Sequence, residues 1–221
     1  MDKDYINRLE GVIKQMLTPL KDIPFNLVIE SMTGRKVTPF DKENSQDQEL
    51  LNVLIKVAKD TSVAINKKGI ESKRPNEVGN YVEPYVRETM ENYDLKPDIP
   101  SSSNGKKKNV GYPDVVFFYK GRPQYLECKT YNFQNVATTQ RSFYFSPSEN
   151  FKVIYDAHHF ILSYQMEMVS QNKGLGIYKC KHFKILSCET LSLDVKYEFN
   201  SDNARMYSGR NGTIILNEGD C

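Results

Sequence analysis

The sequence predicts a fold of the mixed α/β or α+β class, with a mixed central β-sheet flanked by helices. Apolar residues recur at helical spacing in the first third of the chain, and strand-like runs rich in Val, Phe, Tyr and Leu dominate the middle. With 221 residues, the chain can bury a full hydrophobic core without disulfides. We therefore expect a single domain over residues 1–221, with a helical part at 1–75, a core at 76–170, and strands and polar segments at 171–221.

The N-terminal part contains two predicted helices and one predicted strand. Apolar residues at three- and four-residue intervals predict a packing helix over 6–20, and Pro19 helps to end it. The short apolar run 25–30 predicts a strand. Ser45 and Gln48 form a predicted capping box before a second helix rich in Leu and Val.

A third helix is predicted within residues 74–93, where Val78, Val82, Val86 and Met90 share one face. Pro84 requires this helix either to begin near Asn80 or to bend, because proline is tolerated in a first turn but not in a helix interior.

The middle of the chain predicts strands. Two β-rich runs around a turn at Gly121 predict a hairpin. The run 158–169 predicts a half-buried strand with alternating apolar residues, and 175–186 a strand pair or a bent strand. The alternating residues are Phe160, Leu162, Tyr164, Met166 and Met168.

Composition excludes some classes of protein. There is no secretory signal and no run of about 18 apolar residues, so we expect a cytoplasmic protein without membrane contact. A net charge of +2 does not by itself predict a nucleic-acid partner. Four cysteines without a CxxC pair predict free thiols rather than a disulfide framework or a zinc site.

The predicted hairpin carries three charged residues among apolar ones: Asp114, Glu127 and Lys129. Side chains alternate along a strand, so Glu127 and Lys129 share a face. A turn formed by residues 121–122 or 120–123 would place Asp114 opposite Lys129, diagonal to Glu127 and on the same face.

Two converging carboxylates repel each other unless a cation lies between them, and their oxygens suit Mg²⁺. A metal-bound water beside a lysine can hydrolyse a phosphodiester. The alternative is an exposed hairpin with an ion pair on its solvent face, which would contribute little.

Pro113 and Asp114, followed by Glu127, Cys128 and Lys129, resemble the PD...(D/E)xK signature of the restriction-endonuclease-like nuclease superfamily. The resemblance covers roughly residues 77–131. It implies that the single domain is a nuclease whose catalytic core is 76–170, that it depends on Mg²⁺, and that it cleaves DNA.

The resemblance also implies site residues. Asp114, Glu127 and Lys129 are the expected catalytic residues, and Asp114, Glu127 and Cys128 the expected metal-binding positions. Glu83 corresponds to the acid that an upstream helix often contributes in this superfamily, with Glu77 and Glu88 as nearby alternatives.

Two segments are candidates for DNA binding. The polar stretch after the hairpin could read bases in the major groove through amides and an arginine, or could simply be a polar loop with capping roles. Its candidate residues are Asn132, Gln134, Asn135, Gln140 and Arg141. The loop residues Lys106, Lys107 and Lys108 could bind phosphates or be a solvated charge run.

Among nucleases of this superfamily, a compact chain without a helicase or ATPase motif most resembles a type II restriction endonuclease, acting as a homodimer on a short palindromic site. Two alternatives remain open: a repair or recombination nuclease, and a non-catalytic DNA-binding module on the same fold.

Overall fold

The computed structural model describes residues 2–107 and 109–198. The chain divides into two compact units, one formed by residues 23–192 and the other containing the described residues 2–22 and 193–198. The single domain with three parts, expected from the sequence, stays a prediction. None of the helices described is long and apolar enough to cross a membrane.

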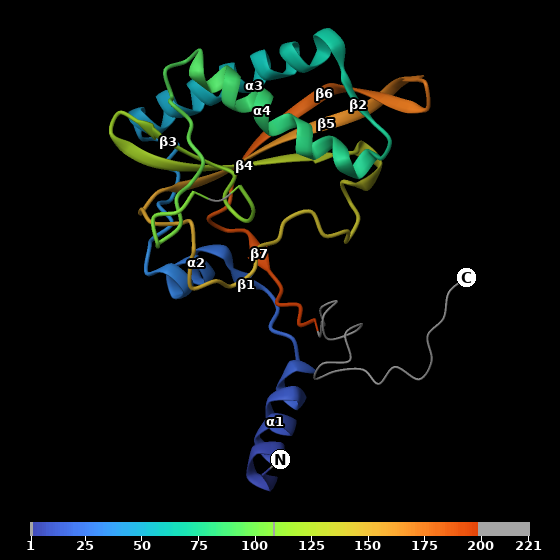
Figure 1. Cartoon of the computed structure of the whole chain (residues 1–221). Helices are drawn as coiled ribbons and strands as arrows, with labels where there is room; N and C mark the ends of the chain where they lie inside the picture. Colours follow the sequence, from blue (N-terminus) through green and yellow to red (C-terminus); the bar gives the residue numbers. More distant parts are fainter. Residues whose placement is uncertain (1, 108, 199–221) are drawn as a thin grey trace, which may run out of the picture. The chain divides into compact units, whose positions relative to one another are not determined.

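The larger unit is built on a five-stranded sheet in the order β2-β6-β5-β4-β3 (Figure 1). Strands β4 and β5 are parallel to each other, and all other neighbours are antiparallel. This confirms the predicted mixed sheet. The strands are β2 (Ile70–Ser72), β3 (Val115–Tyr119), β4 (Arg122–Tyr131), β5 (His158–Asn172) and β6 (Leu175–Ser187).

Two helices, α3 (Ser45–Lys68) and α4 (Val82–Glu91), pack on one face of this sheet, and α2 (Phe25–Thr33) lies on the other side (Figure 1). The main core forms between α3, α4 and the sheet, where Leu54, Val86, Leu126 and Leu162 are fully buried. The short strands β1 (Ile23–Pro24) and β7 (Ser192–Leu193) lie at the two ends of the unit in sequence.

The predicted hairpin is confirmed, but its register differs from the expected one. Val115 pairs with Leu126, and Tyr119 pairs with Arg122. The turn therefore consists of Lys120 and Gly121, both with positive φ, the backbone twist that two-residue hairpins favour. The predicted pairing of Asp114 with Lys129 was wrong by two residues, and a shift by two leaves every side chain on its predicted face.

The strand predicted over residues 25–30 was also wrong, because this run is the start of helix α2. Phe25 and Ile29 are four residues apart and both buried, as one face of a helix requires. Gly34 follows with φ 68°, the left-handed conformation that ends many helices. A short apolar run does not distinguish a strand from a buried helix turn.

The second predicted helix is confirmed as α3, but its cap is one residue earlier than predicted. The Asn44 side chain accepts hydrogen bonds from the backbone N–H groups of Gln46 and Asp47, so Asn44 and not Ser45 is the N-cap. The third helix begins as a 3₁₀ turn, η1 (Pro75–Tyr81), and continues as α4. Pro84 lies in the first turn of α4, where its missing N–H costs no hydrogen bond.

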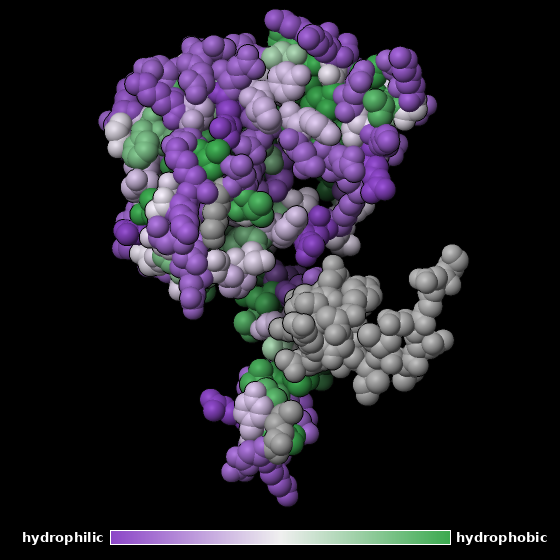
Figure 2. All heavy atoms as spheres, viewed as in Figure 1, coloured by the Kyte–Doolittle hydropathy of each residue, from purple (hydrophilic) through white to green (hydrophobic). Residues whose placement is uncertain are grey.

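Helix α1 (Lys3–Met16) of the smaller unit forms where predicted, but none of its residues is buried. Its apolar stripe, with Ile6, Leu9 and Ile13, is roughly two-fifths exposed and is visible as green residues along the helix (Figure 2). The predicted packing role is therefore not seen in the part of the chain described.

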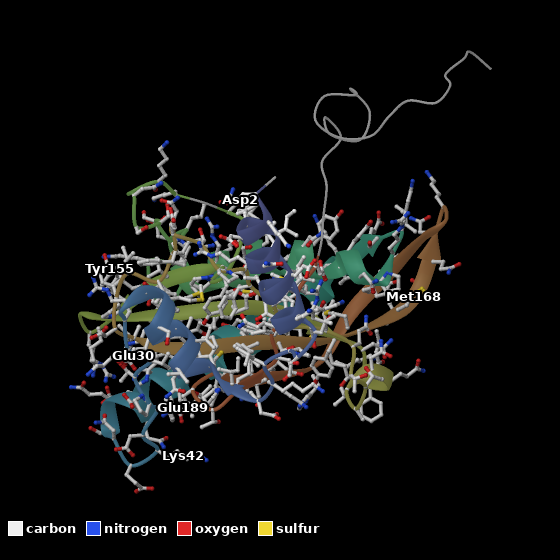
Figure 3. The ribbon with its side chains drawn as sticks, turned by 90° about the horizontal axis from the view of Figure 1, so that it is seen from below. Asp2, Glu30, Lys42, Tyr155, Met168 and Glu189 are labelled. Atoms are coloured by element: carbon white, nitrogen blue, oxygen red, sulfur yellow. The ribbon has the colours of Figure 1, made fainter. Side chains whose placement is uncertain are left out.

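Strand β5 forms where predicted, but it is not half-buried: residues 158–164 are all buried, because both faces of this central strand are covered. Met168 is 53% exposed and projects near the β5–β6 turn (Figure 3). Strand β6 is one long strand, with its register to β5 shifted at two bulges, rather than a pair of strands. The cysteines at 128, 180 and 188 are free, as predicted, and Cys221 lies outside the described residues.

Candidate active site

Asp114 and Glu127 lie together at the start of the hairpin. Continuing the β3–β4 register by one residue places Asp114 across from Glu127. The Asp114 Oδ2 atom accepts a hydrogen bond from the backbone N–H of Cys128, at 2.8 Å, which fixes this carboxylate beside β4. Glu127 is only 4% exposed, and its Oε2 atom has no hydrogen-bond partner.

Lys129 completes the cluster from the same face of β4. Its Nζ atom donates to Glu127 Oε1 at 2.6 Å, and its side chain remains one-quarter exposed. The ammonium also lies 5.9 Å from the ring centroid of Phe143, which belongs to the polar segment after the hairpin. The lysine is therefore held on one side by a carboxylate and reaches the surface on the other.

The electrostatics of the two acids reflect their burial. Desolvation raises the pKa of Asp114, and the Cys128 hydrogen bond and the charge of Lys129 oppose this shift. Desolvation, followed by the charge of Asp114, raises the pKa of Glu127, while Lys129 opposes it. Two desolvated acids side by side, one of which raises the pKa of the other, form a site that gains from binding a cation.

An aromatic group supports the acids on the same side of the sheet. The Tyr112 ring stacks on His159 at 5.9 Å, and its hydroxyl lies 2.6 Å from His159 Nδ1. Phe143 and Phe145 pack against Tyr112 at 5.3 and 5.5 Å. This packing anchors the residues just before Asp114 and one end of the polar segment 132–150.

Two predicted site residues are placed differently from the acidic pair. The Cys128 side chain packs against the main core on the α3–α4 side, and burial raises its thiol pKa strongly. Only its main-chain carbonyl could ligate a metal. Glu83 lies in the first turn of α4, where its carboxylate pairs with Arg87 at 3.2 Å. Its charge also helps to raise the pKa of the Cys128 thiol on β4, and its role beside Asp114 and Glu127 stays a prediction.

The other two acids considered at this helix, Glu77 in η1 and Glu88 in α4, are half-buried and exposed, respectively. Neither has a described contact with the acidic pair. Among the residues described, no group of three or more His, Cys, Asp and Glu side chains is arranged to hold a metal.

The predicted phosphate-binding lysines lie on an ordered turn. Ser101 pairs with Lys107 across it, and the Lys107 ammonium donates to both carboxylate oxygens of Asp98 at 2.7 Å. Lys106 is exposed, and Lys108 lies outside the described residues. Lys107 therefore already has a carboxylate partner, and Lys106 points to solvent.

The predicted base-reading residues are all exposed. Asn132 Oδ1 accepts from the Gln134 backbone N–H and so caps the short 3₁₀ helix η2 (Phe133–Asn135). The Arg141 guanidinium lies over the Tyr144 ring at 4.6 Å. The capping role considered from the sequence thus applies to Asn132, and the other candidate side chains lie at the surface.

The acidic pair fits a hard divalent cation. Glu127 Oε2 is a buried oxygen without a partner, and Mg²⁺ commonly uses one or two carboxylates and fills its other positions with water and substrate phosphate. Asp114 and Glu127 would hold the ion, and the ion would supply a water of lowered pKa and a Lewis acid for a phosphoryl oxygen.

Comparison with known proteins identifies the family of this chain. A model of the type II restriction enzyme MjaV family matches residues 19–210. The chain belongs to this family. A member from Methanocaldococcus jannaschii, named type II restriction enzyme MjaV, is 36% identical over 222 aligned positions, which cover 93% of this chain and 94% of the relative.

Membership of the MjaV family confirms the resemblance stated from the sequence. It decides among the alternatives in favour of a restriction endonuclease, over a repair nuclease or a non-catalytic module. Sequence reasoning missed Tyr112, His159 and Lys152 near the acids. Of these three residues, only Tyr112 could have been found from the motif, because it directly precedes Pro113. His159 and Lys152 come from segments distant in sequence.

Proposed function

We propose that this restriction endonuclease hydrolyses both strands of a short palindromic DNA site, with Asp114 and Glu127 holding Mg²⁺ and Lys129 acting on the attacking water. The observation that carries the proposal is the cluster itself: the buried Glu127 and the half-buried Asp114 on one sheet face, with the Lys129 ammonium 2.6 Å from Glu127.

Lys129 is suited to orient a water molecule. Its ammonium is fixed by Glu127 and by the face of Phe143, yet its side chain is one-quarter exposed, so substrate and water can reach it. It can donate to the water oxygen or to a non-bridging oxygen as negative charge develops on the phosphorus. Asp114, fixed by the Cys128 N–H, needs little reorganisation when the ion enters.

Sequence recognition is proposed for the exposed segment 132–141. Its amide side chains and Arg141 carry the donors and acceptors that read base edges in the major groove. Phe143 and Phe145, packed against Tyr112, attach this segment next to the acids. Lys106 would add contact with phosphates. A two-fold palindrome would be matched by a homodimer.

The proposal is tested by digesting a mapped DNA with Mg²⁺ and with a chelator, and by sequencing the ends. The expected result is discrete fragments with Mg²⁺ only, with Asp114→Asn and Glu127→Gln inactive. Glu71→Gln, at an exposed glutamate of β2, is the matched control and should cut normally. Full cleavage by Asp114→Asn and Glu127→Gln would remove the acids from the mechanism.

A further inference from the structure

Lys152 is a buried lysine close to the acidic pair. It is only 4% exposed, and lysine is almost never buried to this degree unless its charge is compensated. It lies in the connection before β5, more than 20 residues after Lys129, and forms no part of the sequence signature.

The backbone on both sides of Lys152 is fixed. The Ser103 N–H donates to the Phe151 carbonyl at 2.8 Å. On the other side, the backbone N–H groups of Ile154 and Tyr155 donate to the Tyr125 hydroxyl at 2.8 and 3.2 Å. Tyr125 is on β4, two residues before Glu127 and on the same face. The lysine is thus attached to the strand that carries the acid.

The Lys152 ammonium is directed toward the start of the hairpin. Its Nζ atom donates to the carbonyl of Gly111, three residues before Asp114. Its side chain also lines a cavity of about 250 Å³ together with Tyr125 and Tyr155, at the β3 edge of the sheet, where Tyr155 is visible in Figure 3.

The electrostatic interactions agree with this placement. The positive charge of Lys152 opposes the burial-driven rise in the pKa of Asp114, and it does the same for Glu127. The cluster therefore contains two carboxylates and two ammonium groups. Without Lys152, the two carboxylates would face only the partly exposed Lys129 ammonium.

We propose that Lys152 is a positioning residue of the active site, whose buried ammonium compensates the Asp114 and Glu127 carboxylates and fixes the backbone before Asp114. This proposal rests on the active-site assignment made above. Lys129, by contrast, is partly exposed and acts on water, so the two lysines have separate roles. Lys152 would not touch the substrate.

A double-mutant cycle in the metal-free protein tests this role. The unfolding equilibrium is measured in urea, with chelator present, for Lys152→Met, Asp114→Asn and the double variant. We expect Lys152→Met alone to raise the unfolding equilibrium constant about 10-fold or more. In the Asp114→Asn background, the same change should have an effect smaller by a factor of about 10, because the charge it compensates is absent.

Lys67→Met is the matched control, since Lys67 is exposed at the end of α3. Its effect should be small and equal in both backgrounds. If Lys152→Met changes the unfolding equilibrium constant by the same factor with and without the Asp114 charge, Lys152 contributes packing alone and the proposal is overturned.

A variant that does not fold also gives an answer. If Lys152→Met and Lys152→Gln fold only when combined with Asp114→Asn, the proposal is supported. If neither folds in either background, it is overturned. The unfolding measurement does not depend on DNA cleavage. Coupling between Lys152 and Asp114 can therefore be detected even if digestion experiments disprove the catalytic roles. Failure of this proposal is thus distinguishable from failure of the proposed function.

Discussion

Replacing Glu127 by Gln should abolish cleavage and at the same time stabilise the metal-free protein. The Glu127 side chain is almost fully buried, its Oε2 atom has no partner, and Asp114 lies across from it. Glutamine keeps the shape and the hydrogen bond from Lys129 but removes the charge. Two adjacent carboxylates are expected to destabilise the folded protein when no cation lies between them.

The magnitude follows from the pKa of Glu127, which burial and then the Asp114 charge raise from 4.5 to about 7. A shift of this size corresponds to at most about 3.5 kcal/mol at about 1.4 kcal/mol per pKa unit. Part of it is shared with Asp114, so we expect Glu127→Gln to increase the free energy of unfolding by about 1–3 kcal/mol at pH 8.

The direction of this pKa shift determines how the stability of the protein changes with pH. Because the folded-state pKa is raised, the native protein binds more protons than the unfolded chain between about pH 4.5 and 7. Stability from this group is therefore present at low pH and lost as the pH rises through this window. The advantage of Glu127→Gln should be largest above pH 7 and vanish near pH 4.5.

The assay is urea unfolding followed by circular dichroism, with chelator and then with Mg²⁺. Wild-type protein should gain stability on adding Mg²⁺, by an amount that rises with concentration, and the variant should gain less. Glu71→Gln, an exposed glutamate on β2, should change stability by less than about 0.5 kcal/mol. A Glu127→Gln protein that is less stable than wild type at pH 8 in chelator would refute the reasoning.

Three further predictions concern other residues. Lys129→Ala should reduce the cleavage rate by roughly 10²–10⁴ without unfolding the protein, whereas Lys67→Ala should cut normally; a near-normal rate for Lys129→Ala in single-turnover assays would exclude its role. Arg141→Ala should lose about 1–3 kcal/mol of preference for the specific site in binding titrations with Ca²⁺, and an equal loss on random DNA would indicate phosphate contact instead. His159 is neutral when buried, since desolvation lowers its pKa from 6.5 to about 3, so the unfolded chain binds the extra proton and stability falls as the pH drops below about 6.5. We expect about 2 kcal/mol lost from pH 6.5 to 5 in wild type beyond the loss in His159→Gln, and parallel profiles would contradict this.

Local patterns predicted those elements whose signals are strong within a few residues. The hairpin, β5 and helix α3 follow from alternation or helical spacing over long runs. Helix α2 was predicted as a strand because the six-residue run 25–30 is short enough to fit both periods, and packing of Phe25 against Tyr112 and His159 decides for the helix. The hairpin register was wrong because several turn lengths fit the sequence around Gly121, and only the fold selects one.

The sequence by itself determined that Asp114, Glu127 and Lys129 share one face of a hairpin, since strand periodicity of two is a local property that survives a register shift of two residues. Only the tertiary structure decided how deeply Glu127 is buried, that Glu83 pairs with Arg87, and that the Lys152 ammonium contacts the Gly111 carbonyl just before the hairpin. These features depend on contacts between segments far apart in the chain. The spacing of residues within one segment does not specify which charged side chain from a distant segment will lie beside a buried carboxylate.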